Sequence, residues 1–151
     1  PEAHLTIAGQ GYWEPRLRAH AHMVGVSDRV RFAGVVSEQE KSDLLADADL
    51  HLLPSVKEGW GLVIIESGML GTPTVAYRSA GGTNESIVHG ETGLLSDDED
   101  DFHFNIRRLL VQSEERNAMG INAKKFADSF SWDRSVSEVE AALYATANLK
   151  R

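Results

Sequence analysis

The sequence of 151 residues contains no cysteine, so disulfide bonds and zinc sites with thiolate ligands are excluded. No apolar run approaches the roughly 18 to 20 residues that a membrane-spanning helix needs. Positive charge is scarce, because 15 lysines and arginines stand against 23 aspartates and glutamates, for a formal net charge of −8. This balance disfavours a surface for nucleic acid or for an anionic membrane. Residues 1–4 lack signal-peptide character, and together with the absence of cysteine this leads us to expect a cytoplasmic protein.

The remaining composition is that of a globular protein, with 42% hydrophobic and 25% charged residues, and the length predicts one domain over residues 1–151. Short apolar segments alternate with segments of helical periodicity. We expect strands at residues 5–9, 30–34, 49–53, 74–77 and 94–95. We expect helices at residues 13–24, 38–48, 62–70, 101–112, 114–129 and 133–149, with one or two helical turns at 84–88. This alternation predicts an α/β fold with a doubly wound, Rossmann-like parallel sheet and helices on both faces, whose ligands bind beyond the carboxyl ends of the strands.

The start of one helix is marked by a capping box. Ser37 stands three positions before Glu40. The Ser37 hydroxyl can therefore accept a hydrogen bond from the Glu40 backbone N–H, while the Glu40 carboxylate accepts one from the Ser37 backbone N–H. We expect a helix to begin directly after Ser37.

The most informative segment runs from Glu58 to Glu66 and places two carboxylates eight positions apart around a glycine-flanked turn. Gly59 and Gly61 let the backbone approach a ligand closely. The apolar helix that follows offers backbone N–H groups and the positive end of its dipole to a diphosphate. If the segment is helical, eight positions span roughly 12 Å, which is comparable to the distance from a hexose across two phosphates to a ribose. We therefore expect one carboxylate at each end of a nucleotide sugar.

A series of motifs in this strand and helix context resembles a known family. The motifs are Pro54-Ser55, Glu58-Gly59-Trp60-Gly61-Leu62, Glu66, Gly71-Thr72-Pro73, Gly81-Gly82 with Glu85, and Gly93-Leu94-Leu95. Together they look like the carboxyl-terminal, donor-binding domain of retaining family 4 glycosyltransferases of the GT-B fold, over residues 4–145. The resemblance implies a hexosyltransferase that uses a nucleotide diphosphate sugar, such as a UDP- or GDP-sugar, and needs no metal or other cofactor. The acceptor would be a glycan, a lipid or a small molecule.

The resemblance implies distinct roles for the two acids. Glu58 matches the carboxylate that faces the transferred sugar and is needed for transfer, and Glu66 matches the one that hydrogen-bonds the ribose hydroxyls. Retention of configuration can come from a same-face substitution without an enzyme nucleophile or from a double displacement with one. We favour the first route, in which Glu58 acts through electrostatics and positioning.

The resemblance also implies donor-binding positions. Backbone groups of four consecutive residues match those that contact the sugar and the diphosphate: Gly59, Trp60, Gly61 and Leu62. Val36 and Ser55 lie in loops that flank the base, and Gly81 and Gly82 are candidates for contact with phosphate.

These residues also have purely structural interpretations. Glu58 could be a solvated charge in a loop, and Glu66 could be a surface residue of its helix, although its neighbours leave little polar face. The Trp60 side chain could pack in the core and leave only its backbone in the site. Gly81 and Gly82 form a turn in either interpretation.

Three other patterns favour structural roles. Gly9-x-Gly11 follows a strand but has Glu14 where a dinucleotide-binding fingerprint needs its third glycine, so we expect a turn. The Asp-Glu-Asp of residues 98–100 resembles a metal-binding Asp-x-Asp pair, yet its place before a helix favours an amino-terminal cap. The six histidines are scattered, and we expect no metal site.

The sequence departs from the family at its beginning. The family's donor domain starts with a further strand and a loop whose arginine and lysine clamp the diphosphate, and neither precedes residue 5. Lys57 and Arg78 lie near the relevant loops but do not match the clamp positions. The absent strand would lie between the strands at 5–9 and 49–53, and its loss would leave unpaired backbone on both.

The amino-terminal acceptor domain of the family also has no counterpart in this sequence. We therefore expect little transferase activity from this chain alone, and any membrane contact of the intact protein would involve the acceptor domain. Two alternatives remain open. One is a noncatalytic nucleotide-sugar-binding module, and the other is a sugar-nucleotide epimerase of similar fold.

Overall fold

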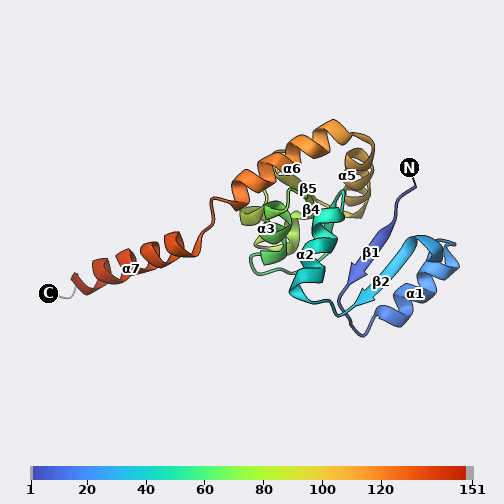
Figure 1. Cartoon of the computed structure of the whole chain (residues 1–151), viewed down its shortest axis with the longest axis horizontal. Helices are drawn as coiled ribbons and strands as arrows, with labels where there is room; N and C mark the ends of the chain where they lie inside the picture. Colours follow the sequence, from blue (N-terminus) through green and yellow to red (C-terminus); the bar gives the residue numbers. More distant parts are fainter. Residues whose placement is uncertain (1, 149–151) are drawn as a thin grey trace. The chain divides into compact units, whose positions relative to one another are not determined.

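The computed structural model describes residues 2–148, and the chain divides between Ala48 and Asp49 into two compact units (Figure 1). The sequence predicted a doubly wound parallel sheet without the strand that would lie between those at 5–9 and 49–53. The first unit holds a two-stranded sheet in the order β1-β2, and the second holds a three-stranded sheet in the order β3-β4-β5. Every strand pair is parallel, as the alternation of strands and helices predicted. Within the described chain, β1 and β3 each pair with a strand on one side alone, so each has an unpaired edge.

The first unit is a strand-helix-strand-helix segment. Its elements are β1 (Leu5–Ala8), α1 (Glu14–Met23), the short 3₁₀ helix η1 (Ser27–Arg29), β2 (Val30–Gly34) and α2 (Glu38–Asp47). Leu5 of β1 pairs with Val30 of β2, and Figure 1 shows the two strands side by side. Most side chains of β1 and α1 are exposed, so this unit holds little apolar core of its own.

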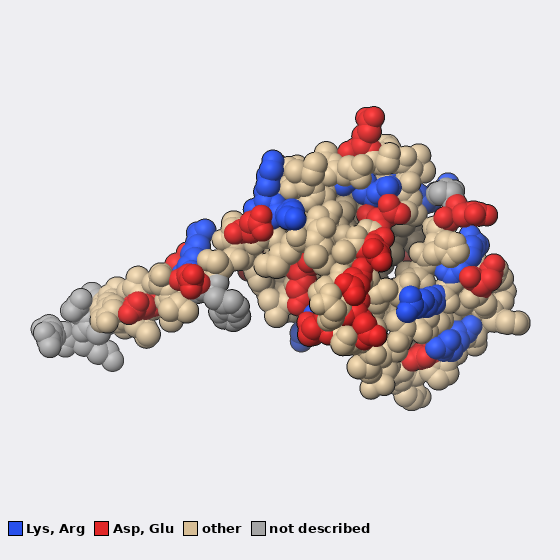
Figure 2. Space-filling model, viewed as in Figure 1, with Lys and Arg blue, Asp and Glu red and all other residues tan. Residues whose placement is uncertain are grey.

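The capping box at the start of α2 is confirmed. The Glu40 backbone N–H donates to Ser37 Oγ at 3.2 Å, and the Ser37 backbone N–H donates to Glu40 Oε2 at 2.8 Å. The hydrogen bond from the Ser37 backbone N–H lowers the pKa of Glu40 below its usual value, and the hydrogen bond from the Ser37 hydroxyl lowers it further. Further acids follow on the exposed side of this helix, and Figure 2 shows acidic side chains gathered along it. This part of the surface would repel a polyanion.

The second unit contains the remaining elements, in the order that the sequence predicted. They are β3 (His51–Leu53), α3 (Leu62–Met69), β4 (Thr74–Tyr77), the 3₁₀ helix η2 (Arg78–Ala80), α4 (Thr83–Ser86), β5 (Gly93–Ser96), α5 (Glu99–Val111), α6 (Ser113–Ala127) and α7 (Trp132–Asn148). Among the residues that the structure describes, no helix is long and apolar enough to cross a bilayer.

The sheet of the second unit is buried on both faces, which is the doubly wound arrangement. Successive residues of a strand point to opposite faces. Val75 and Leu94 pack on one face against side chains of α5 and α6, whereas Ala76 and Leu95 pack on the other face against Ile64 of α3. The apolar character of β4 and β5 on both faces therefore follows from helices that cover the sheet twice.

Small residues allow α3 to approach α6 closely. A Cβ atom added to Gly68 would lie 3.1 Å from the Ala123 carbonyl oxygen, and one added to Gly120 would overlap the Gly71 carbonyl oxygen. Interiors are too densely packed to absorb such an overlap without movement of the backbone. The position of α3, which carries Glu66, therefore depends on these glycines.

We predict that Gly120→Ala destabilises the protein by about 1 to 3 kcal/mol, because the overlap with Gly71 outweighs the gain in helix propensity of roughly 1 kcal/mol. Urea unfolding followed by circular dichroism measures the change. The control is Ile121→Ala on the same helix, where the side chain is 59% exposed and little packing is lost. Equal stability of the two variants would contradict the proposed role of close packing between α3 and α6.

Candidate functional site

Two loops of the second unit meet through their backbones at the carboxyl ends of neighbouring strands. One loop follows β3 and runs from residue 54 to 61, and the other follows β4 through η2 to residue 82. The Glu58 backbone N–H donates to the Ala80 carbonyl oxygen at 2.6 Å, and Glu58 forms an isolated parallel bridge with Gly81. Glu58 is therefore held in a defined place although it lies outside regular secondary structure. The residue as a whole is partly buried.

Gly81 and Gly82 make this approach of the two loops possible. Gly81 has a φ of 103°, and a Cβ atom there would lie 2.9 Å from the Glu58 carbonyl oxygen. A Cβ atom on Gly82 would overlap the carbonyl group of Gly59. Both positions therefore require glycine for the loop contact itself. The prediction of a turn at Gly81 and Gly82 is confirmed, and their contact with phosphate stays a prediction.

Side chains after the glycine pair hold the second loop in shape, and the sequence alone did not identify them. Thr83 Oγ1 donates to the Tyr77 carbonyl oxygen at 2.8 Å. Asn84 Nδ2 donates to the carbonyl oxygens of Arg78 at 2.8 Å and Gly81 at 3.1 Å. A hydroxyl and an amide directly after a glycine pair would have been the signal for these loop-stabilising contacts.

Helix α3 begins at the first of these loops with a glycine. Gly61 is buried, has a φ of 78° and is the amino-terminal cap, and no side chain caps the helix. The Ile64 backbone N–H donates to the Gly61 carbonyl oxygen at 2.8 Å. The prediction of a glycine-flanked helix start is confirmed. However, the segment is helical only from Leu62, so the span of roughly 12 Å estimated for eight helical positions between Glu58 and Glu66 does not apply.

Helix α3 is apolar, as the sequence indicated, but it is buried on one face only. Ile64, Ile65 and Gly68 are buried, but Leu62 is 67% exposed and Met69 is 45% exposed. Leu62, Glu66 and Met69 follow one another at four and three positions, which places them on one uncovered face. Because side chains of a helix tilt toward its amino terminus, Glu66 extends back toward the glycine turn. It is partly buried and therefore belongs to the border of this face.

A histidine on β3 lies close to Glu66. His51 Nδ1 is 3.0 Å from Oγ1 of Thr74, which is buried. Burial lowers the pKa of His51 to about 4, although the Glu66 carboxylate acts in the opposite direction. The imidazole is therefore neutral at pH 7. Sequence reasoning treated His51 as an ordinary structural histidine and gave no indication of its proximity to Glu66.

The Trp60 side chain packs within the second unit. Its ring lies edge-to-face with Phe130, with 4.9 Å between the ring centroids, and Phe130 in turn packs on Phe126. This matches the structural interpretation of the side chain, in which only the Trp60 backbone faces the loop. Gly59, in contrast, has open space where its Cβ atom would lie.

The other predicted residues are more dispersed. Ser55 is partly buried in the loop after β3, close in sequence to Glu58. Val36 belongs to the first unit, in the turn between β2 and α2. Arg78 pairs with Asp97 at 2.8 Å and donates to the Leu95 carbonyl oxygen at 3.4 Å. Arg78 is therefore engaged at the end of β5.

The acidic run before α5 caps that helix. Asp98 is the amino-terminal cap, and its Oδ1 accepts a hydrogen bond from the Asp101 backbone N–H at 2.9 Å. The structural interpretation of residues 98–100 is confirmed. Among the residues that the structure describes, no group of three or more histidine, aspartate or glutamate side chains is placed to hold a metal ion.

Comparison with known proteins identifies the family of this chain. The family model described as "Glycosyl transferases group 1" matches residues 1–126. The chain belongs to this family. A D-inositol 3-phosphate glycosyltransferase of Salinispora tropica is 34% identical over 135 residues, which cover 87% of this chain and 28% of that protein. The enzyme of the same name from Corynebacterium efficiens is 36% identical over 126 residues, which cover 82% of this chain and 29% of that protein.

Solved structures of glycosyltransferases share the fold. Anabaena Alr3699/HepE, solved with UDP and glucose, matches with a TM-score of 0.85 and 23% identity, over 96% of this chain and 41% of that chain. WaaG, a glycosyltransferase involved in lipopolysaccharide biosynthesis, matches with a TM-score of 0.75 and 27% identity, over 85% of this chain and 34% of that chain. The resemblance to the carboxyl-terminal domain of GT-B glycosyltransferases is confirmed. The chain spans only 26% to 33% of the length of the curated relatives it matches.

We predict that Gly82→Ala lowers stability by about 1 to 3 kcal/mol, since its Cβ atom overlaps the Gly59 carbonyl group and forces the two loops apart. The control is Gly59→Ala, because Gly59 lies across the same contact but has open space around its Cβ position. Thermal unfolding measures both variants. A Gly82→Ala variant as stable as Gly59→Ala would show that the loops are not held together by this approach.

We predict that His51 contributes a pH dependence to stability. Its pKa is lowered from 6.5 to about 4, so the unfolded chain binds a proton that the folded chain rejects. Stability is therefore complete above pH 6.5 and falls as the pH drops toward 4, by at most about 3 kcal/mol. In His51→Asn this loss should be absent, whereas His103→Asn, at an exposed position on α5, should keep it. Urea unfolding at several pH values distinguishes the two variants. The prediction would be refuted if the free energy of unfolding depended on pH in the same way in His51→Asn and in the unaltered protein.

Proposed function

We propose that this chain is the donor-binding part of a retaining, family 4 glycosyltransferase that transfers a hexose from a nucleotide diphosphate sugar. The observation that carries the proposal is the backbone contact between the loop at Glu58 and the glycine pair at 81–82, directly before the uncapped start of α3. Two backbone segments and a helix start offer N–H groups to a diphosphate without needing a basic side chain. Membership of the family and the fold shared with UDP-bound HepE support it.

The two acids have different roles in this proposal. Glu58, fixed by its backbone hydrogen bond to Ala80, faces the sugar, and Glu66, one helical turn beyond Leu62, holds the ribose hydroxyls. Backbone groups at Gly59, Trp60, Gly61 and Leu62 contact the sugar and the diphosphate, with Gly81 and Gly82 beside them, while Ser55 and Val36 flank the base. The exposure of Leu62, one helical turn before the partly buried Glu66, supports an open approach for the ribose.

Charge development explains why these groups suit the reaction. Departure of the diphosphate leaves positive charge on the anomeric carbon and adds negative charge to the leaving phosphate. A carboxylate near the anomeric carbon and fixed N–H dipoles near the leaving phosphate both stabilise the transition state more than the ground state. Transfer on the same face of the sugar then needs no covalent intermediate, because the leaving phosphate itself takes the acceptor's proton.

The rest of the enzyme lies outside this sequence in our proposal. An amino-terminal domain of the same protein supplies the acceptor site, the reaction takes place in the cytoplasm, and no metal or other cofactor takes part. The acceptor is a glycan, a lipid or a small molecule. The names of the curated relatives make D-inositol 3-phosphate the first acceptor to assay. This chain alone would show weak donor affinity and little or no transfer.

Substitution of the two acids in the full-length protein tests the proposal. We predict that Glu58→Gln lowers kcat on the order of 100-fold with little change in the dissociation constant for UDP or GDP, since its charge acts on the developing positive charge. Glu66→Gln should weaken nucleotide binding by about tenfold, because it loses charge-assisted hydrogen bonds to the ribose, with a smaller effect on kcat. Steady-state kinetics and isothermal titration calorimetry measure the two effects.

The control is Glu114→Gln, at an exposed position in the first turn of α6, which should leave both constants unchanged. Equal and negligible effects of the two site substitutions would defeat the assignment. Tight nucleotide binding without transfer to any acceptor would instead favour the noncatalytic binding module. Interconversion of a sugar nucleotide without an acceptor would favour the epimerase.

A further inference from the structure

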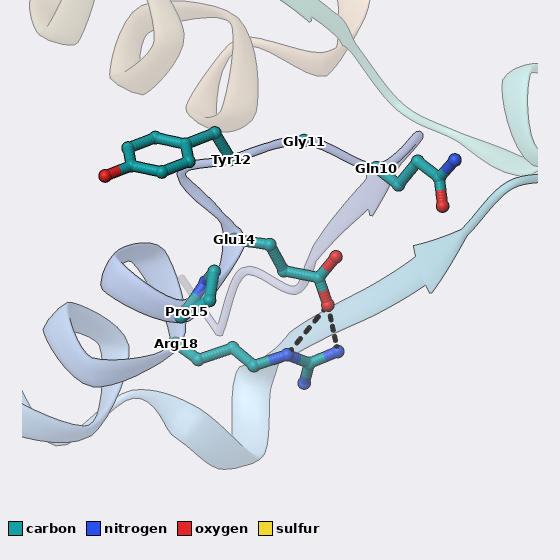
Figure 3. A pocket seen from close by; sticks show the side chains of 6 residues that line it. All are labelled: Gln10, Gly11, Tyr12, Glu14, Pro15 and Arg18. Atoms are coloured by element: carbon teal, nitrogen blue, oxygen red, sulfur yellow. Dashed lines mark hydrogen bonds and ion pairs between the residues drawn. The ribbon is translucent and has the colours of Figure 1, made fainter.

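An open pocket of about 660 Å³ lies in the first unit, where the loop after β1 turns into α1. Six residues line it and are drawn in Figure 3: Gln10, Gly11, Tyr12, Glu14, Pro15 and Arg18. The volume falls within the range of roughly 300 to 1,000 Å³ that small-molecule sites occupy. None of these residues has a part in the proposed donor site.

One end of the pocket is apolar. Figure 3 shows the Tyr12 ring at this end of the loop, with Pro15 on the same side. Tyr12 is 84% exposed, and its ring lies edge-to-face with that of Trp13, with 6.3 Å between the ring centroids. Next to it, Trp13 is 60% exposed, with the Arg16 guanidinium 4.6 Å from its ring centroid. Two adjacent, solvent-exposed aromatic side chains are typical of a recognition surface.

The other end is polar but electrically neutral. Arg18 donates from Nε at 2.9 Å and from Nη2 at 2.8 Å to the same oxygen, Oε1 of Glu14 (Figure 3). The Arg18 guanidinium also lies 4.2 Å from the centroid of the Phe32 ring in β2. The position of the Arg18 guanidinium is therefore fixed, and the Glu14 carboxylate balances its charge. Arg18 Nη1, Glu14 Oε2 and the Gln10 amide remain to bond a ligand.

We propose that this pocket binds a neutral saccharide. A pyranose ring has an apolar face of C–H groups and a rim of hydroxyls, which match the Tyr12 ring at one end and the groups of Gln10, Glu14 and Arg18 at the other. A phosphate or sulfate ligand fits less well, because the Arg18 charge is already paired with Glu14. A purely apolar ligand fits less well too, because it would bury the polar end without hydrogen bonds. The site is a glycan-binding surface of its own, beyond the donor site.

Titration of the protein with neutral tetrasaccharides of glucose, mannose and N-acetylglucosamine tests the proposal, with backbone amide NMR shifts as the readout. We expect at least one of them to shift the amides of residues 11–18 at millimolar concentration. Tyr12→Ala should weaken this binding by about tenfold, since it removes the stacking ring. The matched control is Phe104→Ala, which removes another exposed ring, 63% exposed, from α5 and should leave binding unchanged. Glu14→Gln should also weaken it, because it frees the Arg18 guanidinium from its fixed position.

Three results would overturn the proposal. The first is the absence of shifts in residues 11–18 with all three saccharides. The second is tighter binding of inorganic pyrophosphate than of any saccharide at this loop, and the third is equal loss of binding in Tyr12→Ala and Phe104→Ala. UDP titration reports on the loops of the second unit, so failure of the donor assignment would appear as a separate result.

Discussion

The candidate site depends on one contact, in which two stretches of backbone approach each other without side chains between them. The Glu58 N–H bonds the Ala80 carbonyl oxygen, and Gly82 lies against Gly59 so closely that no Cβ atom fits. This contact places a carboxylate, two glycine turns and a helix start in one small region. Any larger residue at Gly82 would separate the loops and with them the groups that are proposed to hold a diphosphate.

The sheet of the second unit explains why these loops meet. β3 and β4 are parallel neighbours, so the loops that follow them leave the same edge of the sheet. β4 is buried on both faces, which fixes the direction in which its chain leaves toward Gly81. Close packing of α3 on α6 then sets where Glu66 lies relative to that edge. The geometry of the loops is thus a consequence of packing some distance from them.

Local signals in the sequence were sufficient to predict most elements. The capping box at Ser37 located the start of α2, and the strand at Thr74–Tyr77 was predicted to the residue, because Pro73 and the apolar run after it allow little else. Motif order was enough to predict the family. The separation of β1 from β3 into two sheets agrees with the absence of the strand expected between them, which the motif series indicated and local periodicity did not, since periodicity carries no mark of which strands are neighbours.

Sequence motifs named the candidate residues but not the groups that hold them in place. Glu58 and Gly81 were identified by motif, yet Glu58 is held by the carbonyl group of Ala80, and the Gly81 carbonyl is held by the Asn84 side chain. A backbone carbonyl is present at every residue, so sequence carries no signal for its use. The same holds for His51, whose neutral state follows from burial and could not be read from its place in a strand.

A site built mainly from backbone has a consequence for specificity. The Trp60 side chain packs on Phe130, and the Leu62 side chain lies on an exposed face. Neither side chain therefore lines the turn at Gly61. In the proposed complex the diphosphate would then be held in the same way whichever base or sugar it carries. Discrimination between donors must arise from the few side chains that reach the ends of the ligand, chiefly Glu58 and Glu66, and from loops outside this turn. Changes of donor preference should therefore come from substitutions around the turn rather than within it, because in the proposed complex the backbone groups of the turn would contact every donor in the same way.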